Sequence, residues 1–161
     1  MADLMRDSDR REHELNQALE ALHFAFRAVV ARPDQLLARR GLSRVHHRIL
    51  YFVGRNPGLQ VSALLAILQI SKQSLHAPLR QLVQARLLTV GTDPDDGRVR
   101  RLRLTARGAD LEDRLSGDQR QRFARVFAEV GERKAAAWRE VMQRLANDDR
   151  EDGTEGKEGA D

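Results

Sequence analysis

The sequence predicts a mainly α-helical protein with one small β-hairpin (an α+β arrangement). Three observations lead to this fold class. Apolar residues recur at helical spacing over most of the chain, the spacing changes to two only within residues 87–105, and strong turn-forming residues divide that stretch. The 161 residues are enough for one domain with appendages. No stretch approaches the ~20 apolar residues of a membrane span, so we expect no membrane partner.

The first helix is expected over residues 9–31, because leucines and other apolar residues recur there at helical spacing. Pro33 and Asp34 are expected to interrupt it before a short segment at 35–40. The whole region 1–42 is therefore read as an N-terminal helical part.

Three short helices are expected in the middle of the chain, with a tight turn at residues 69–70 between the second and the third. Ser43 is a good N-cap for a helix at 44–55, and a helix at 61–68 follows with Gln60 as a poor cap. Ser71 caps a third helix, roughly 72–86. Short helices across a tight connection form a helix-turn-helix.

A basic hairpin follows directly. Residues 87–92 and 99–105 are candidate strands, and the turn residues 93–97 separate them. Leu102 and Leu104 share one face of the second strand, whereas Arg101 and Arg103 share the other. A helix-turn-helix followed by such a ribbon is a winged helix, and we assign residues 43–108 to this lobe.

The turn of this otherwise basic hairpin carries three acidic residues. We therefore expect Asp93, Asp95 and Asp96 to act within the hairpin, through Asx-turn hydrogen bonds and an ion pair with a wing arginine.

The C-terminal part is expected to hold two more helices within residues 109–146. Thr105 caps a helix running to about Ser116, Gly117 and Asp118 break it, and a long helix follows at about 119–146. We expect eight residues of that last helix to form its buried face: Phe123, Val126, Phe127, Val130, Trp138, Val141, Met142 and Leu145.

Charge is distributed unevenly along the chain. Residues 147–161 hold seven acidic and two basic residues, and we expect them to form a disordered acidic tail. The preceding 146 residues hold 26 basic and 17 acidic residues, a balance that suits a polyanionic partner. Most of the basic residues are Arg, which suits phosphate and guanine but is equally typical of a GC-rich genome.

Double-stranded DNA is the partner that this arrangement favours. The start of the second helix of a helix-turn-helix can lie in the major groove, and the ribbon can reach the neighbouring minor groove or the backbone. Taken singly, a polar helix start is usually a cap and a charged ribbon is usually a solvated face; their co-location favours DNA. The candidate contact residues are Ser71, Lys72, Gln73, Ser74, His76 and Arg80 in the helix, and Arg98, Arg100 and Arg101 in the wing.

Other chemistry is largely excluded. The chain has no cysteine, which rules out disulfides and thiolate metal sites, and its five histidines lack zinc-ligand spacing. No phosphate-binding loop or nucleophile elbow is present, so we expect no enzyme activity, no cofactor and no metal. The N-terminus lacks an apolar signal core, so we expect the protein in the cytoplasm.

The wing motif resembles that of the MarR (multiple antibiotic resistance regulator) family. The run from Asp93 to Arg98, DPDDGR, followed by LRLTARG at 102–108, matches the family pattern D-P-x-D-x-R and then L-T-x-x-G. The resemblance covers about residues 12–146 in architecture and 60–108 in specific motif. It implies a homodimeric winged-helix regulator in which regions 1–42 and 109–146 of the two protomers interlock. It also implies that the dimer binds a near-palindromic DNA site and that Arg98 enters the minor groove.

The resemblance also implies a repressor relieved by a small molecule. The effector pocket is expected between the dimerisation helices and the DNA-binding lobe, with Phe26, Val30, His47 and Tyr51 as candidate lining residues. The alternative is that these four residues are ordinary core or surface residues.

Two positions depart from the family pattern. Gly97 stands where another Arg is common, and Pro78 lies inside the recognition helix, where we expect a kink or a tilted first turn. Both departures favour an alternative function, a winged helix that serves as a protein-interaction module without specific DNA binding.

Overall fold

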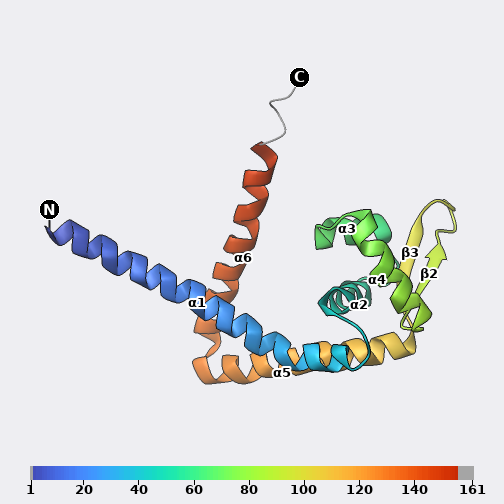
Figure 1. Ribbon diagram of the computed structural model, residues 1–161, viewed down its shortest axis with the longest axis horizontal. Coiled ribbons are helices and arrows are strands. Elements are labelled where there is room, and N and C mark those ends of the chain that lie inside the picture. Colours follow the sequence, from blue (N-terminus) through green and yellow to red (C-terminus); the bar gives the residue numbers. More distant parts are fainter. Residues whose placement is uncertain (1, 156–161) are drawn as a thin grey trace. The chain divides into compact units, whose positions relative to one another are not determined.

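The computed structural model describes residues 2–155, and the side chains of residues 7–148. The chain divides into two compact units, Met1–Gln119 and Arg120–Asp161. Figure 1 shows the elements in chain order. They are α1 (Ala2–Ala38), α2 (Arg44–Arg55), β1 (Leu59–Gln60), α3 (Val61–Leu68), α4 (Lys72–Gln84), β2 (Leu88–Thr92), β3 (Arg100–Leu104), α5 (Ala106–Val130) and α6 (Glu132–Glu155).

The predicted helix-turn-helix and hairpin are confirmed. Helices α2 and α3 have the expected bounds, and α4 ends at Gln84, two residues early. In the turn between α3 and α4, Gln69 adopts a left-handed conformation with φ of 51°. Thr105 caps α5 as expected, since its Oγ1 accepts from the Gly108 N–H at 3.0 Å. None of the described helices is long and apolar enough to cross a membrane.

The sheet has one more strand than the sequence predicts. Its order is β1-β3-β2, and both pairings are antiparallel. Leu102 in β3 pairs with Leu59 on one side and with Val90 on the other. Strand β1 is two residues long, too short to show an alternating pattern.

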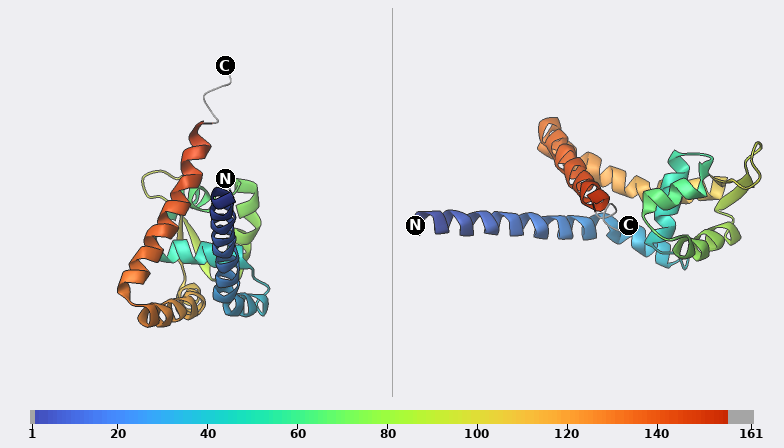
Figure 2. Two further views of the ribbon diagram at one scale, coloured as in Figure 1. Left: turned by 90° about the vertical axis from the view of Figure 1, so that its left-hand side faces the viewer. Right: turned by 90° about the horizontal axis from the view of Figure 1, so that it is seen from above.

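The core of the first unit lies between α2, α3, α4, α5 and the sheet. Its fully buried side chains include Ile49, Leu64, Leu82, Leu102 and Leu115. By contrast, the N-terminal half of α1 extends away from α2–α4 (Figure 2). There Leu15, Leu19 and Leu22 are 52%, 66% and 49% exposed.

The expected interruption at Pro33 is wrong, because α1 continues through it to Ala38. Pro33 has no N–H to donate to the carbonyl oxygen of Val29. The side-chain amide of Gln119 donates to that oxygen instead, at 3.5 Å. Beyond the proline, Leu37 is buried in the core, which favours the continued helix.

The expected break at Gly117 and Asp118 is also wrong. Helix α5 runs through both residues, and the chain turns at Gly131, whose φ is 86°. A helical glycine costs only about 1 kcal/mol, which the neighbouring buried Leu115 offsets. Helices commonly end at a residue with a positive φ, which glycine adopts without strain, and Gly131 provides that residue.

The second unit is a pair of helical segments joined at Gly131. Phe123, Phe127 and Trp138 form a ring cluster with centroids 5.3–5.6 Å apart. The expected buried face is only partly buried within one chain: Phe123, Phe127 and Met142 are half-buried, whereas its other five apolar residues are exposed. Val126, Val130, Trp138, Val141 and Leu145 are between 41% and 57% exposed.

The expected disordered tail is partly helical. Helix α6 continues through residues 147–155 to Glu155. The remaining part of that predicted tail, residues 156–161, lies outside the described residues.

Candidate nucleic-acid interface and effector cavity

The start of α4 presents a polar, exposed surface. Ser71 Oγ accepts from the Ser74 backbone N–H at 3.1 Å and caps the helix as predicted. Leu75 and Leu82 anchor the opposite side of the helix in the core. The six candidate contact residues of this segment are all exposed: Ser71, Lys72, Gln73, Ser74, His76 and Arg80.

Pro78 does not interrupt α4, which runs unbroken from Lys72 to Gln84. The carbonyl that loses its donor belongs to Ser74, an exposed residue, so water can satisfy it. The expected tilt of the first turn stays a prediction.

The side chains of Asp93 and Asp96 organise the hairpin turn, as the sequence predicts for these two of its three acidic residues. Asp93 Oδ1 accepts from the backbone N–H groups of Asp95 and Asp96, at 2.9 and 3.3 Å. Asp96 Oδ1 accepts from the Arg98 N–H at 3.0 Å. The backbone donor of Asp95 and the Arg101 guanidinium lower the pKa of Asp93, so this carboxylate stays charged.

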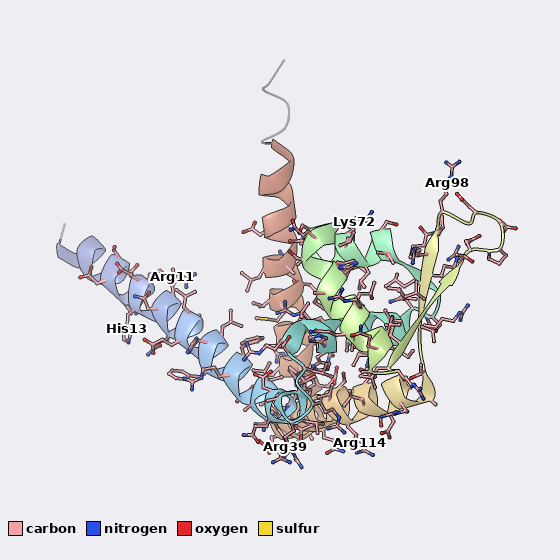
Figure 3. The ribbon with its side chains drawn as sticks, turned by 45° about the vertical axis from the view of Figure 1, so that its right-hand side comes forward. Arg11, His13, Arg39, Lys72, Arg98 and Arg114 are labelled. Atoms are coloured by element: carbon pink, nitrogen blue, oxygen red, sulfur yellow. The ribbon has the colours of Figure 1, made fainter. Side chains whose placement is uncertain are left out.

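The wing arginines divide into two groups. Arg101 donates to the Asp93 carboxylate and to the Gly58 carbonyl, the latter at 3.1 Å. Arg98 and Arg100 are exposed, and neither has an ion-pair partner within the part of the chain that the structure describes. Arg98 projects from the hairpin tip on the side of the first unit where Lys72 lies, whereas Arg39 lies on the opposite side (Figure 3). Lys72 and Arg98 are therefore two separate positive charges on the same side of the first unit.

A cavity of about 300 Å³ lies between the C-terminal half of α1 and α2. All four residues that the sequence proposes for a pocket line it: Phe26, Val30, His47 and Tyr51. Six further lining residues were not foreseen: Pro33, Asp34, Arg44, Arg48, Phe52 and Gln119. Arg44 lies three residues before His47, Tyr51 lies four residues after it, and Arg48 lies four residues after Arg44, so the sequence does place these residues on one side of α2.

The two arginines of the cavity differ in their partners. Arg44 forms a bidentate ion pair with Asp34, with Nε and Nη2 both within 2.9 Å of Oδ2, and its guanidinium lies 5.2 Å from the centre of the Phe26 ring. Arg48 has no ion-pair partner among the described residues. The cavity therefore offers one free cation beside apolar and aromatic walls.

A chain of hydrogen bonds leads from His47 through two residues of α5 to Arg55. Its Nε2 is 3.1 Å from Ser116 Oγ, which donates to the buried carboxylate of Glu112. Arg55 completes the chain, donating to Glu112 Oε1 at 2.9 Å. Burial lowers the pKa of His47, and the Glu112 charge only partly opposes this, so the imidazole is neutral at pH 7. Glu112 and Ser116 were missed because they come from α5, far away in sequence.

Comparisons of the sequence with known proteins identify the family of this chain. The model of the MarR family matches residues 40–99. The HTH-type transcriptional regulator PetP of Rhodobacter capsulatus is 37% identical over 134 residues, which is 83% of this chain and 81% of PetP.

Solved structures show the same fold. The crystal structure of a MarR family transcription regulator aligns with a TM-score of 0.72 at 24% identity, covering 93% of this chain and 97% of that one. The structure of NadR in complex with 4-hydroxyphenylacetate aligns with a TM-score of 0.62 at 25% identity, covering 83% of this chain and 89% of NadR.

Proposed function

The chain belongs to the MarR family of helix-turn-helix transcriptional regulators, and on that premise we propose that it is a homodimeric repressor of a near-palindromic DNA site. A small molecule bound in the α1–α2 cavity would release it from that site. The observation that carries the proposal is the common direction of two exposed cationic points, Lys72 at the start of α4 and Arg98 at the wing tip.

The two cationic points suit different parts of a duplex. The exposed start of α4, residues 71–76, fits the major groove, where Gln73 can pair with adenine and Lys72 with guanine or phosphate. Arg98 fits the neighbouring minor groove, and Arg80 and Arg100 fit the backbone. Arg101 contributes by keeping the turn in shape, because its guanidinium already donates to Asp93 and Gly58.

The exposed apolar faces support a dimer. Leu15, Leu19 and Leu22 recur along one side of α1, and Val141 and Leu145 are about half exposed on α6. Faces of this kind are costly in water and are typical of protein–protein contacts. A two-fold dimer would read two half-sites of a near-palindrome.

The cavity supports a small anionic ligand with an apolar body. Arg48 supplies a free cation, while Phe26, Tyr51 and Phe52 supply aromatic walls. NadR, whose structure contains 4-hydroxyphenylacetate, shows that a protein of this fold accommodates a molecule of that chemistry.

Selection of bound duplexes from a random DNA pool, at near-physiological salt, tests the proposal. We expect a two-fold symmetric consensus, and a protein that sediments as a dimer both free and on that duplex. Recovery of no consensus would contradict sequence-specific regulation and favour the protein-interaction module. A monomer, or a consensus with a single half-site, would contradict the dimer.

A further inference from the structure

The first turn of α2 carries a buried histidine that reaches the recognition helix. His46 is 5% exposed. Its Nδ1 lies 3.0 Å from the backbone nitrogen of Ser43, which donates to it. Its Nε2 lies 2.6 Å from Oε1 of Gln81, in the third turn of α4. One side chain therefore connects the beginning of α2 with α4.

The hydrogen bonds identify which ring nitrogen carries the proton. Because Nδ1 accepts from the Ser43 N–H, the proton of the neutral ring lies on Nε2. The Nε2–H then donates to Gln81 Oε1. Gln81 therefore accepts in this bond through its side-chain oxygen. The hydrogen bonds of His46 fit only the neutral tautomer that carries its proton on Nε2.

The hydrogen bond between His46 and Gln81 depends on orientation, whereas the apolar contacts of α4 do not. Leu75 and Leu82 hold α4 in the core through apolar packing, which tolerates small rotations and shifts of a helix. Within the described residues, His46–Gln81 is the one side-chain hydrogen bond between α4 and another element. It therefore constrains the rotation of α4 about its own axis, which determines where the exposed side chains at its start point.

We propose that His46 is a positioning residue for DNA reading, which holds the recognition helix in its base-reading orientation through Gln81. The proposal rests on the proposed function. Base contacts depend on orientation far more than phosphate contacts do, so loss of the bond lowers specific affinity and leaves non-specific affinity nearly unchanged.

The same turn of α2 borders the cavity. Arg44, two residues before His46, and His47, directly after it, both line the cavity. A ligand that displaces this turn therefore acts on the residue that holds α4, which gives the cavity a physical connection to the DNA-binding surface.

Two substitutions at one position separate the contacts of His46 Nδ1 with Ser43 from the hydrogen bond of Nε2 with Gln81. In His46→Asn, the side-chain oxygen can replace Nδ1 and accept from Ser43, but the side chain is too short to reach Gln81. In His46→Gln, the longer amide can donate to Gln81. The measurements are the dissociation constants for the selected duplex and for a scrambled duplex of equal length, together with the thermal midpoint of each variant.

We expect His46→Asn to bind the selected duplex about three- to tenfold more weakly, with the scrambled duplex unaffected, and His46→Gln to recover most of the loss. Gln81→Leu should reproduce the loss, and the double variant His46→Asn/Gln81→Leu should be no weaker than either single variant. Gln84→Leu, an exposed glutamine substitution on the same helix, is the matched control and should change nothing.

The positioning role is overturned by equal losses on both duplexes, by additive losses in the double variant, or by a ring proton found on Nδ1 in nitrogen NMR of the His46 imidazole. If a His46 variant fails to fold, the comparison of Gln81→Leu with Gln84→Leu decides the question. A wild-type protein without a preferred duplex contradicts the proposed function itself. A wild-type preference that His46→Asn and Gln81→Leu leave intact contradicts only the inference.

Discussion

Arg101, in β3, donates its Nε–H to the carboxylate of Asp93, the residue that directly follows β2. The ion pair closes the base of the hairpin turn, and the same carboxylate accepts two backbone N–H groups within the turn. An acidic residue thereby becomes part of a basic wing, because it determines where the turn and its exposed arginines lie.

The role of Asp93 can be tested by whether its removal weakens or strengthens DNA binding. Removing an acidic residue beside DNA should strengthen binding if charge alone matters. We expect Asp93→Ala to weaken binding at least threefold instead, because the turn loses its acceptors. Asp95→Ala, an exposed acid on the same turn, should leave affinity unchanged or raise it. Stronger binding by Asp93→Ala, measured by fluorescence anisotropy, would contradict the role.

The wing-tip role of Arg98 predicts a loss of DNA affinity without a loss of stability. Arg98→Ala should weaken binding by roughly 1–3 kcal/mol, since one groove contact disappears. The thermal midpoint should not change, because Arg98 is exposed. Arg39→Ala removes another exposed arginine, on the opposite side of the unit, and is the matched control. Equal effects of the two substitutions would show that only net charge matters.

Gly108 is expected to be intolerant of any side chain. A Cβ at this position would lie 1.9 Å from the backbone oxygen of Leu87, which also accepts from the Thr105 N–H. Gly108→Ala should lower the free energy of unfolding by about 1–3 kcal/mol, because the backbone must shift. Gly97→Ala, which would meet nothing within 4 Å, should change it by less than about 0.5 kcal/mol. Urea denaturation of both variants checks this.

His47 predicts a pH dependence of stability. Burial lowers its pKa in the folded protein, so below about pH 6.5 the unfolded chain binds a proton at this position more readily than the folded one does. The stabilising contribution is complete above that pH and is lost as pH falls through the folded-state pKa. Urea denaturation between pH 7.5 and 5 should show the wild type losing more stability than His47→Gln. Parallel curves would show that His47 is not responsible.

Local patterns were sufficient to predict the DNA-binding lobe. The caps Ser71 and Thr105 and the turn acid Asp93 each act on backbone groups within three residues of themselves. Such short-range chemistry is visible in a sequence, which is why α2, α3 and the hairpin appear where they were expected.

The sequence-based predictions are wrong or incomplete where residues far apart in the sequence determine the local structure. Pro33 was expected to end a helix, but Gln119 supplies a donor to the carbonyl that the proline leaves unpaired. Gly117 and Gly131 look alike in sequence, and only tertiary packing determines that the first is helical and the second has a positive φ. In the cavity, candidate residues of α1 and of α2 were recognisable, whereas Glu112 and Ser116 of α5 became neighbours of His47 only through folding.

Footprinting on the selected duplex tests the central claim most directly, namely that α4 reads the major groove while Arg98 enters the minor groove. With the wild type, we expect guanine N7 protection in both half-sites and hydroxyl-radical protection in the flanking minor groove. With Arg98→Ala, the minor-groove protection should disappear while the N7 protection remains. A footprint that is identical for both proteins, or protection of the minor groove alone, would contradict this account of how the protein binds DNA.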